Sequence, residues 1–274
     1  MKRSGIITLL TDFGLVDPYV AMMKGVILSI NPNAVIVDIS HSIMTGGIAQ
    51  ASDMIKETYP FFPRGTVHIA VVDPGVGSDR RLLGIEAEGH FFVGPDNGIF
   101  WPIIKDYKKA LAIQLTEKRY FLPHVTSTFH GRDVFAPVAA HLSLGEDLMQ
   151  MGARIYNPVE ITLPSPTVTG DSLYGEITRI DNFGNLITNI RRQGLEDFLK
   201  KSKPVIYIGN LEIRKIADTY FDVEGGEPLA LINSSGLLEI AVNLGRASEY
   251  SGLRPDEIVG TVVRVLKGGR ISKR

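Results

Sequence analysis

The apolar stretch TVHIAVV at residues 66–72 runs without a break into the polar, glycine-rich stretch DPGVGSDRR at 73–81. A short apolar run rich in β-branched residues predicts a buried strand, and the Pro-Gly pair after it predicts a tight turn. Strands buried on both faces are typical of parallel sheets covered by helices. The stretch therefore predicts an α/β domain with a polar loop after the carboxyl end of a buried strand.

The residues before this stretch alternate between strand and helix patterns. We expect buried strands at 6–10 and 34–39, and helices at 18–30 and 47–59. The first helix should begin with Asp17 as its N-cap and Pro18 at its first position. This order predicts a largely parallel sheet with right-handed crossovers, and ligands of such sheets bind at the loops that follow the strands.

The second half of the chain has a different pattern. Residues 164–171, rich in Pro, Thr and Gly, are expected to be a linker between an α/β domain at 1–163 and a small domain at 172–274. Short alternating runs punctuated by Gly and Asn then follow, at 173–180, 185–190, 204–208, 228–232, 237–242 and 258–266. They predict an all-β, barrel-like domain, with one helix near 195–201.

Composition narrows the function classes. The 29 basic and 30 acidic residues nearly cancel, so no nucleic-acid or membrane-surface partner is expected. The absence of cysteine excludes disulfides, thiolate nucleophiles and Cys-ligated metals. The first 14 residues contain only a five-residue apolar run, and no stretch approaches the ~18 apolar residues of a membrane span. We expect a cytoplasmic protein.

Asp73 and Arg80 are the first candidate site residues. Asp73 follows the buried strand directly, where an α/β protein places reactive groups. The alternative is a turn whose aspartate accepts local backbone N–H groups, with Arg80 on the surface. Position alone leaves both interpretations open.

His130 is the best catalytic candidate among the six histidines. It precedes a predicted helix for which Asp133 is the expected cap, and the positive end of a helix favours a neutral imidazole ring. His68 and His141 fall inside a strand and a helix and are expected to be structural, whereas His41 follows a strand and stays a candidate. Thr11-Asp12 and the segments 94–98, 181–185 and 233–236 are further polar clusters, the last three of which are typical of turns.

Six segments in this order resemble the S-adenosylmethionine hydrolases, also called S-adenosylmethionine hydroxide adenosyltransferases, which are related to fluorinases and chlorinases. They are LLTDFG (9–14), VVDPGVGSDRR (71–81), GPDNGIF (94–100), TFHGRDVFAP (128–137), IDNFGNLITNI (180–190) and INSSGLLEIAVN (232–243). The resemblance covers essentially the whole chain and implies hydrolysis of S-adenosylmethionine to adenosine and methionine. It implies that Asp73, Arg80 and His130 position the attacking water, and it does not decide which group takes the proton.

The same resemblance implies the substrate contacts. Asp12 would accept from the ribose hydroxyls, and Phe129 and Gly131 would line the pocket near the sugar. Asp181 would bind the methionine ammonium, Ser234 the carboxylate and Asn185 the adenine. No metal or other cofactor is implied. The expected assembly is a homotrimer whose sites lie between subunits.

Three alternatives compete with hydrolysis. Halogenation at C5′ is disfavoured, because the halogenating relatives carry a tyrosine where this chain has Asp73, and a carboxylate repels a halide. A protein that binds adenosine or S-adenosylmethionine without turnover would form no products. A metal-dependent hydrolase using Asp12, Asp17 and Asp73 would lose activity on chelation.

Overall fold

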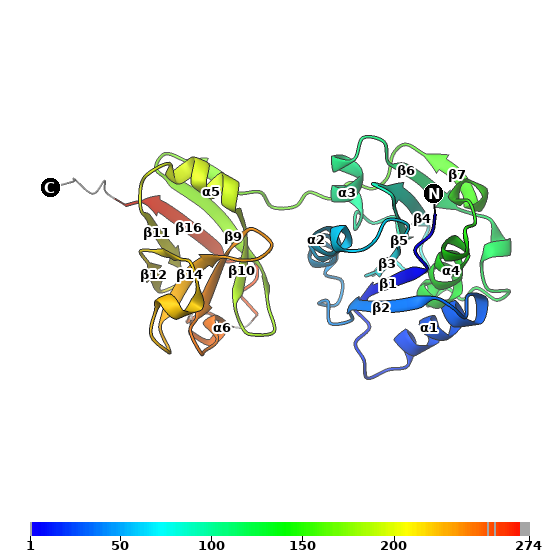
Figure 1. The fold of residues 1–274 in the computed structure, drawn as a ribbon, viewed down its shortest axis with the longest axis horizontal. Coiled ribbons are helices and arrows are strands. Elements are labelled where there is room, and N and C mark those ends of the chain that lie inside the picture. The colour runs from blue at the N-terminus through cyan, green and yellow to red at the C-terminus, as the bar shows by residue number, and fades with distance from the viewer. Residues whose placement is uncertain (1, 251, 255, 269–274) are drawn as a thin grey trace. The chain divides into compact units, whose positions relative to one another are not determined.

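The computed structural model describes residues 2–250, 252–254 and 256–268, so the end of the predicted second domain, 269–274, lies outside the described residues. The chain divides into two compact units, Met1–Thr162 and Leu163–Arg274. Figure 1 shows a sheet with helices in the first unit and a strand-rich second unit.

The first unit is built on a seven-stranded sheet in the order β2-β1-β3-β5-β4-β6-β7. The strands are β1 (Ile6–Thr11), β2 (Val35–Ser40), β3 (Val67–Val71), β4 (Leu82–Ala87), β5 (His90–Pro95), β6 (Leu111–Leu115) and β7 (Gly152–Ile155). The β2-β1-β3-β5 half is parallel as predicted, but the pairs β5-β4, β4-β6 and β6-β7 are antiparallel. The α/β class is therefore confirmed, with a mixed sheet.

The turn between β4 and β5 explains part of this difference. Glu88 and Gly89 join the two strands with φ values of 50° and 86°. A two-residue hairpin turn with positive φ at both positions matches the twist of antiparallel strands. A glutamate at the first position gives no sequence signal for such a turn.

Helices cover both faces of this sheet (Figure 1). The α-helices are α1 (Tyr19–Ile30), α2 (Ile48–Thr58), α3 (Trp101–Asp106) and α4 (Ala136–Leu144), with short 3₁₀ turns at Tyr59–Phe61, Lys118–Tyr120 and Leu148–Met151. Buried residues of α1 and α4 pack on one face, and those of α2 and α3 pack on the other. One expectation is wrong: Asp17 is exposed, and α1 starts after Pro18 with no side-chain cap.

The second unit is a nine-stranded sheet in the order β12-β11-β16-β9-β10-β15-β14-β13, with β8 paired to β9. Its elements are β8 (Thr167–Thr169), β9 (Ser172–Ile180), β10 (Leu186–Arg191), α5 (Arg192–Leu199), β11 (Pro204–Ile208), β12 (Leu211–Ile213), β13 (Ile216–Ala217), a 3₁₀ turn (Tyr220–Asp222), β14 (Pro228–Ile232), β15 (Leu237–Val242), α6 (Ala247–Tyr250) and β16 (Val262–Lys267). The sheet curls around a main apolar core, with a smaller apolar cluster beside β13 and β14, and β12 contacts β14. This confirms the barrel-like all-β prediction.

The segment expected to be a linker contains a strand. Thr167–Thr169 forms β8 and pairs antiparallel with Leu173 and its neighbours in β9. Gly170 has a φ of 57°, so Gly170 and Asp171 make a tight hairpin turn between the two strands. The Thr-rich composition that indicated a linker also suits an exposed edge strand.

No helix among the described residues is suited to crossing a bilayer, and the longest, α1, has 12 residues.

Candidate active site

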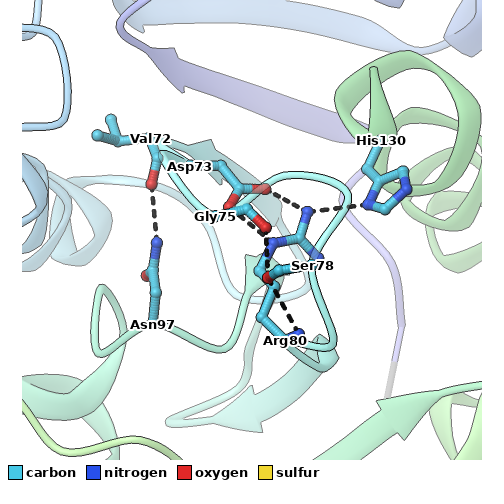
Figure 2. A network of polar contacts seen from close by, with 7 residues as sticks. All are labelled: Val72, Asp73, Gly75, Ser78, Arg80, Asn97 and His130. Carbon is cyan, nitrogen blue, oxygen red and sulfur yellow. Dashed lines mark hydrogen bonds and ion pairs between the residues drawn. The ribbon is translucent and has the colours of Figure 1, made fainter. Parts of the chain in front are cut away.

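The loop after β3 is held in a fixed form by its own hydrogen bonds. The Ser78 hydroxyl donates to the Gly75 carbonyl at 2.6 Å, and the Val76 N–H donates to the Asp73 carbonyl at 3.2 Å. From outside the loop, the Asn97 side chain donates to the Val72 carbonyl at 2.8 Å, so the GPDNGIF segment anchors the end of β3 (Figure 2).

Gly77 is required for this loop to close. Its φ is +82°, and a Cβ atom there would lie 2.5 Å from the Ser127 carbonyl oxygen. Any other residue would combine a strained backbone with a steric clash. The glycine therefore lets the Asp73 loop pack against the segment that leads to His130.

Arg80 joins Asp73 to His130 (Figure 2). Its guanidinium binds both carboxylate oxygens of Asp73, with Nε 2.6 Å from Oδ1 and Nη2 in contact with Oδ2. The same Nη2 lies 2.9 Å from His130 Nδ1. The side chains of Asp73 and Arg80 are only 5% and 8% exposed, so the ion pair is largely shielded from water. We call these three residues the His130 cluster.

The environment of His130 keeps its ring neutral. Burial lowers the pKa of His130, and the positive charge of Arg80 lowers it further, while Asp73 and Asp133 act in the opposite direction. An arginine side chain can only donate hydrogen bonds, so Nδ1 must be the accepting nitrogen. The neutral ring then carries its proton on Nε2.

Asp133 does not cap a helix as the sequence suggested. It is fully buried in a five-residue π-helical turn, Gly131–Phe135, that leads into α4. Its carboxylate accepts from the Thr126 N–H and hydroxyl, at 2.8 and 2.6 Å, and from Arg132 Nε at 2.6 Å. A buried carboxylate needs such donors, and here they fix the segment that carries His130.

A pocket of about 300 Å³ opens beside the His130 cluster. This volume is at the lower end of the range for small-molecule sites, roughly 300–1,000 Å³. Apart from Val71, the last residue of β3, its lining residues follow β1, β2 and β3 or precede α4. The lining residues are Asp12, Phe13, Thr45, Gly46, Val71, Asp73, Pro74, Val76, Thr128, Phe129, His130 and Gly131. The pocket thus lies at the carboxyl ends of parallel strands, as expected for the fold.

The pocket brings together five of the predicted site residues, which are Asp12, Asp73, Phe129, His130 and Gly131. Arg80 contacts Asp73 but does not line the pocket. One Asp12 oxygen, Oδ2, accepts from the Gly46 N–H at 3.0 Å.

The sequence analysis missed several of the lining residues. Phe13, Thr45 and Val76 are among them, and none of the three carries a chemical signature of catalysis. Phe13 and Val76 lie inside the motifs at 9–14 and 71–81, and all three lie in loops that follow a predicted strand. Phe13 and Phe129 pack edge to face, with ring centroids 5.8 Å apart.

The remaining predicted binding residues lie in turns of the second unit. Asp181 accepts from the Phe183 and Asn185 N–H groups, each at 2.9 Å, and from the Asn185 amide at 3.0 Å. Ser234 is exposed in the turn between β14 and β15. These contacts show ordinary turn chemistry, and the substrate contacts of Asp181, Asn185 and Ser234 stay predictions.

Within the part of the chain that the structure describes, no group of three or more His, Asp or Glu side chains is arranged to hold a metal ion.

Family models match both units. A model of the SAM hydroxide adenosyltransferase N-terminal domain matches residues 7–152, and one of the C-terminal domain matches residues 175–260. The chain is 38% identical to an (R)-S-adenosyl-L-methionine hydrolase of Thermus thermophilus over 94% of this chain and 98% of that protein. It is 30% identical to a fluorinase of an Actinoplanes species over 87% and 91% of the two chains.

Solved structures share the fold over nearly the whole chain. An uncharacterized conserved protein from Thermotoga maritima superposes with a TM-score of 0.88 at 34% identity, covering 95% of this chain and all of that one. The six motifs, the two matched domains and this superposition agree, and the chain belongs to the SAM hydroxide adenosyltransferase family.

Proposed function

We propose that this protein hydrolyses S-adenosyl-L-methionine to adenosine and L-methionine by attack of water on the ribose C5′. The observation that carries the proposal is the placement of Asp73 and His130 on the wall of one pocket, joined by a largely buried arginine. Relatives named (R)-S-adenosyl-L-methionine hydrolase, at 34–38% identity, support the same reaction.

The difficult part of this reaction is the activation of the nucleophile, because the leaving group is already a good one. The positive sulfonium of the substrate leaves as the neutral thioether of methionine and needs no acid. Water is a weak nucleophile that must be oriented and must lose a proton as it attacks. In the proposed step the oxygen of water bonds to C5′, the C5′–S bond breaks with its electron pair going to sulfur, and one proton leaves the water.

We infer that Asp73 accepts this proton. Arg80 occupies His130 Nδ1, which leaves the ring a donor at Nε2. Each Asp73 oxygen accepts from Arg80 but keeps a second lone pair. His130 would then hold the oxygen of the water and Asp73 would bind its proton.

Buried Arg80 Nη1 has no hydrogen-bond partner among the described residues. A buried donor left unpaired costs about 1–3 kcal/mol. The bonds that Nε and Nη2 make with Asp73, and the contact of Nη2 with His130, offset this cost.

Halogenation at C5′ is the second candidate, because fluorinases at 28–30% identity are relatives. The charge on the pocket wall argues against it. Asp73 lines the pocket whereas Arg80 does not, so an entering halide would meet the carboxylate. The side chains of this wall therefore favour water.

The resemblance also supports a homotrimer with sites between subunits. In this proposal Asp181, Asn185 and Ser234 of one copy bind the adenine and the amino acid part of a substrate held in the pocket of another copy. Light scattering on the purified protein tests the trimer. Mixing Asp73→Asn and Ser234→Ala subunits tests the shared site, because restored turnover requires sites built from two chains.

The test of the reaction is incubation with S-adenosyl-L-methionine in ¹⁸O-labelled water, with the products analysed by mass. Both sulfur epimers are supplied, because the hydrolase relatives are named for the (R) form. We expect label in the adenosine 5′-hydroxyl and unlabelled methionine. Turnover without label at C5′ would overturn the mechanism. A 5′-halogenated product in added chloride or fluoride would support halogenation, and binding without products would support a binding protein.

A further inference from the structure

Two threonines of β1 make the same contact with two different histidines. Thr8 Oγ1 lies 2.8 Å from His68 Nδ1, and Thr11 Oγ1 lies 2.8 Å from His41 Nδ1. All four residues are buried, none of them more than 4% exposed. The two threonines are three residues apart, so they point to opposite faces of the sheet. Only the Thr11 pair lies next to residues that line the pocket.

The contacts of His41 continue to the surface. Its Nε2 lies 3.2 Å from Asp38 Oδ1, and Lys24 donates to the other Asp38 oxygen at 2.6 Å. Burial acts to raise the pKa of Asp38, but the contacts with Lys24 and His41 outweigh it and the pKa is lowered. The Nε2–Oδ1 contact has an ion-pair distance but no hydrogen-bond geometry, so the charge of Asp38 acts on the ring through space and favours a proton on Nε2. We call Asp38, His41 and Thr11 the Thr11 relay.

The shape of β2 brings Asp38 and His41 to this position. Leu9 of β1 pairs with Asp38, but Leu10 pairs with Ser40, so β2 has an extra residue at this point. Such irregularities bend a strand and redirect the side chains that follow. The bend precedes the turn in which His41 approaches Thr11.

The relay ends on the backbone of the loop after β1, which carries the pocket residues Asp12 and Phe13. With the His41 proton on Nε2, the Thr11 hydroxyl donates to Nδ1 and its oxygen accepts from the Phe13 N–H at 3.2 Å. The His41 carbonyl accepts from the Gly14 N–H at 2.8 Å. His41 thus contacts the chain on both sides of Asp12: its ring binds Thr11, and its backbone carbonyl binds Gly14.

We propose that His41 is a positioning residue for substrate binding, which acts through Thr11 to hold Asp12 and Phe13 against the sugar of the substrate. The inference rests on the proposed function, since it concerns how the same pocket binds a nucleoside. Among the described residues, no hydrogen bond or ion pair joins the relay to Asp73, Arg80 or His130, so we expect the relay to affect binding rather than the chemical step. Its loss therefore raises KM and leaves kcat nearly unchanged.

The test compares Thr11→Val with Thr8→Val. Each variant removes one buried hydroxyl from β1 and leaves Nδ1 of one histidine without its partner, so both should lose stability. Only Thr11→Val also removes the acceptor of the Phe13 N–H. We expect Thr11→Val to raise KM for S-adenosyl-L-methionine and Kd for adenosine about tenfold, the equivalent of ~1.4 kcal/mol of lost hydrogen bonding, with kcat within about twofold. Thr8→Val should keep the wild-type KM, and Thr11→Ser should restore it.

Asp38→Asn is the second variant, and it tests the relay from its exposed end if Thr11→Val does not fold. It removes the charge that faces Nε2 and should raise KM about threefold. Equal KM values for Thr11→Val and Thr8→Val, or an unchanged KM in Asp38→Asn, would overturn the relay alone. A wild-type protein that neither binds adenosine nor turns over the substrate would overturn the proposed function as well.

Discussion

The first unit contains two histidine clusters of opposite character. In the His130 cluster, an ion pair joins the ring to a carboxylate on the wall of a pocket. In the other, which we call the His68 cluster, His68 Nδ1 contacts the Thr8 hydroxyl and Nε2 lies 3.2 Å from His90 Nδ1. The His68 ring also stacks on Phe92, with centroids 5.1 Å apart.

Burial lowers the pKa of the histidine in both clusters, and it lowers that of His68 to about 3. A shifted pKa therefore does not by itself distinguish a reactive residue from a core residue. The two histidines differ in whether a ring nitrogen is left free to contact a ligand. His68 uses both ring nitrogens inside the core, whereas the ring of His130 uses Nδ1 on Arg80 and lines the pocket.

The largest effect is expected for Asp73→Asn. The change removes the proposed proton acceptor, so kcat should fall about a thousandfold in the steady-state assay. It also leaves the largely buried Arg80 without its anion, which should lower the free energy of unfolding by ~3 kcal/mol in urea. Asp106→Asn, which changes an exposed aspartate paired with Lys56, is the control for charge removal. Full activity in Asp73→Asn would exclude Asp73 as the base.

The same substitution in the two histidines should give opposite results. His130→Gln is expected to lower kcat about a hundredfold with little change in the free energy of unfolding, because the ring is half-exposed and acts on the substrate. His68→Gln should keep kcat and lose ~2 kcal/mol, because its ring is packed in the core. Paired kinetics and urea unfolding measure both effects. A loss of kcat in His68→Gln would break the distinction between the clusters.

Acid should destabilise the fold through His68. Its folded-state pKa of about 3 lies below the ordinary value of about 6.5, so the unfolded chain takes up the proton first. The stability is complete above pH 6.5 and falls as the pH decreases, by ~1.4 kcal/mol at pH 5.5. Urea unfolding of the wild type between pH 5.5 and 7.5 measures this loss. His68→Gln should reduce this loss and not abolish it, because the pKa values of His90, His130 and His141 are also lowered by burial. An unchanged pH dependence in that variant would place its origin outside His68.

The smallest effect is expected in how kcat/KM declines at low pH. Because the pKa of His130 is lowered, its ring stays neutral below the ordinary histidine range. Turnover should therefore persist as the pH falls past 6.5 and decline only at lower pH. Comparing kcat/KM against pH for the wild type and His130→Gln tests this, because the decline caused by protonation of His130 should be absent from the variant, in which only protonation of Asp73 lowers the rate.

Some features of this protein were determined by the sequence alone. The apolar run at 66–72 is sufficient for a buried strand, and the Asp73 that follows it lies at the strand end where the pocket forms. The six strand runs predicted in the second half agree with the structure within about two residues, except 258–266, where β16 begins at Val262. The short strands β8, β12 and β13 were not predicted. Periodicity and turn residues act over a few positions, so they are visible without any knowledge of distant contacts.

Other features depended on contacts between distant segments. The antiparallel half of the first sheet, the packing of the Asp73 loop against Ser127 and the pocket walls formed by Thr45 and Gly46 are set by which segments meet in space. The protonated nitrogen of His130 is set by Arg80, which lies 50 residues away in the chain. The residues next to His130 in the sequence do not reveal that Arg80 is its partner. Only the tertiary structure therefore decided which ring nitrogen of His130 carries the proton.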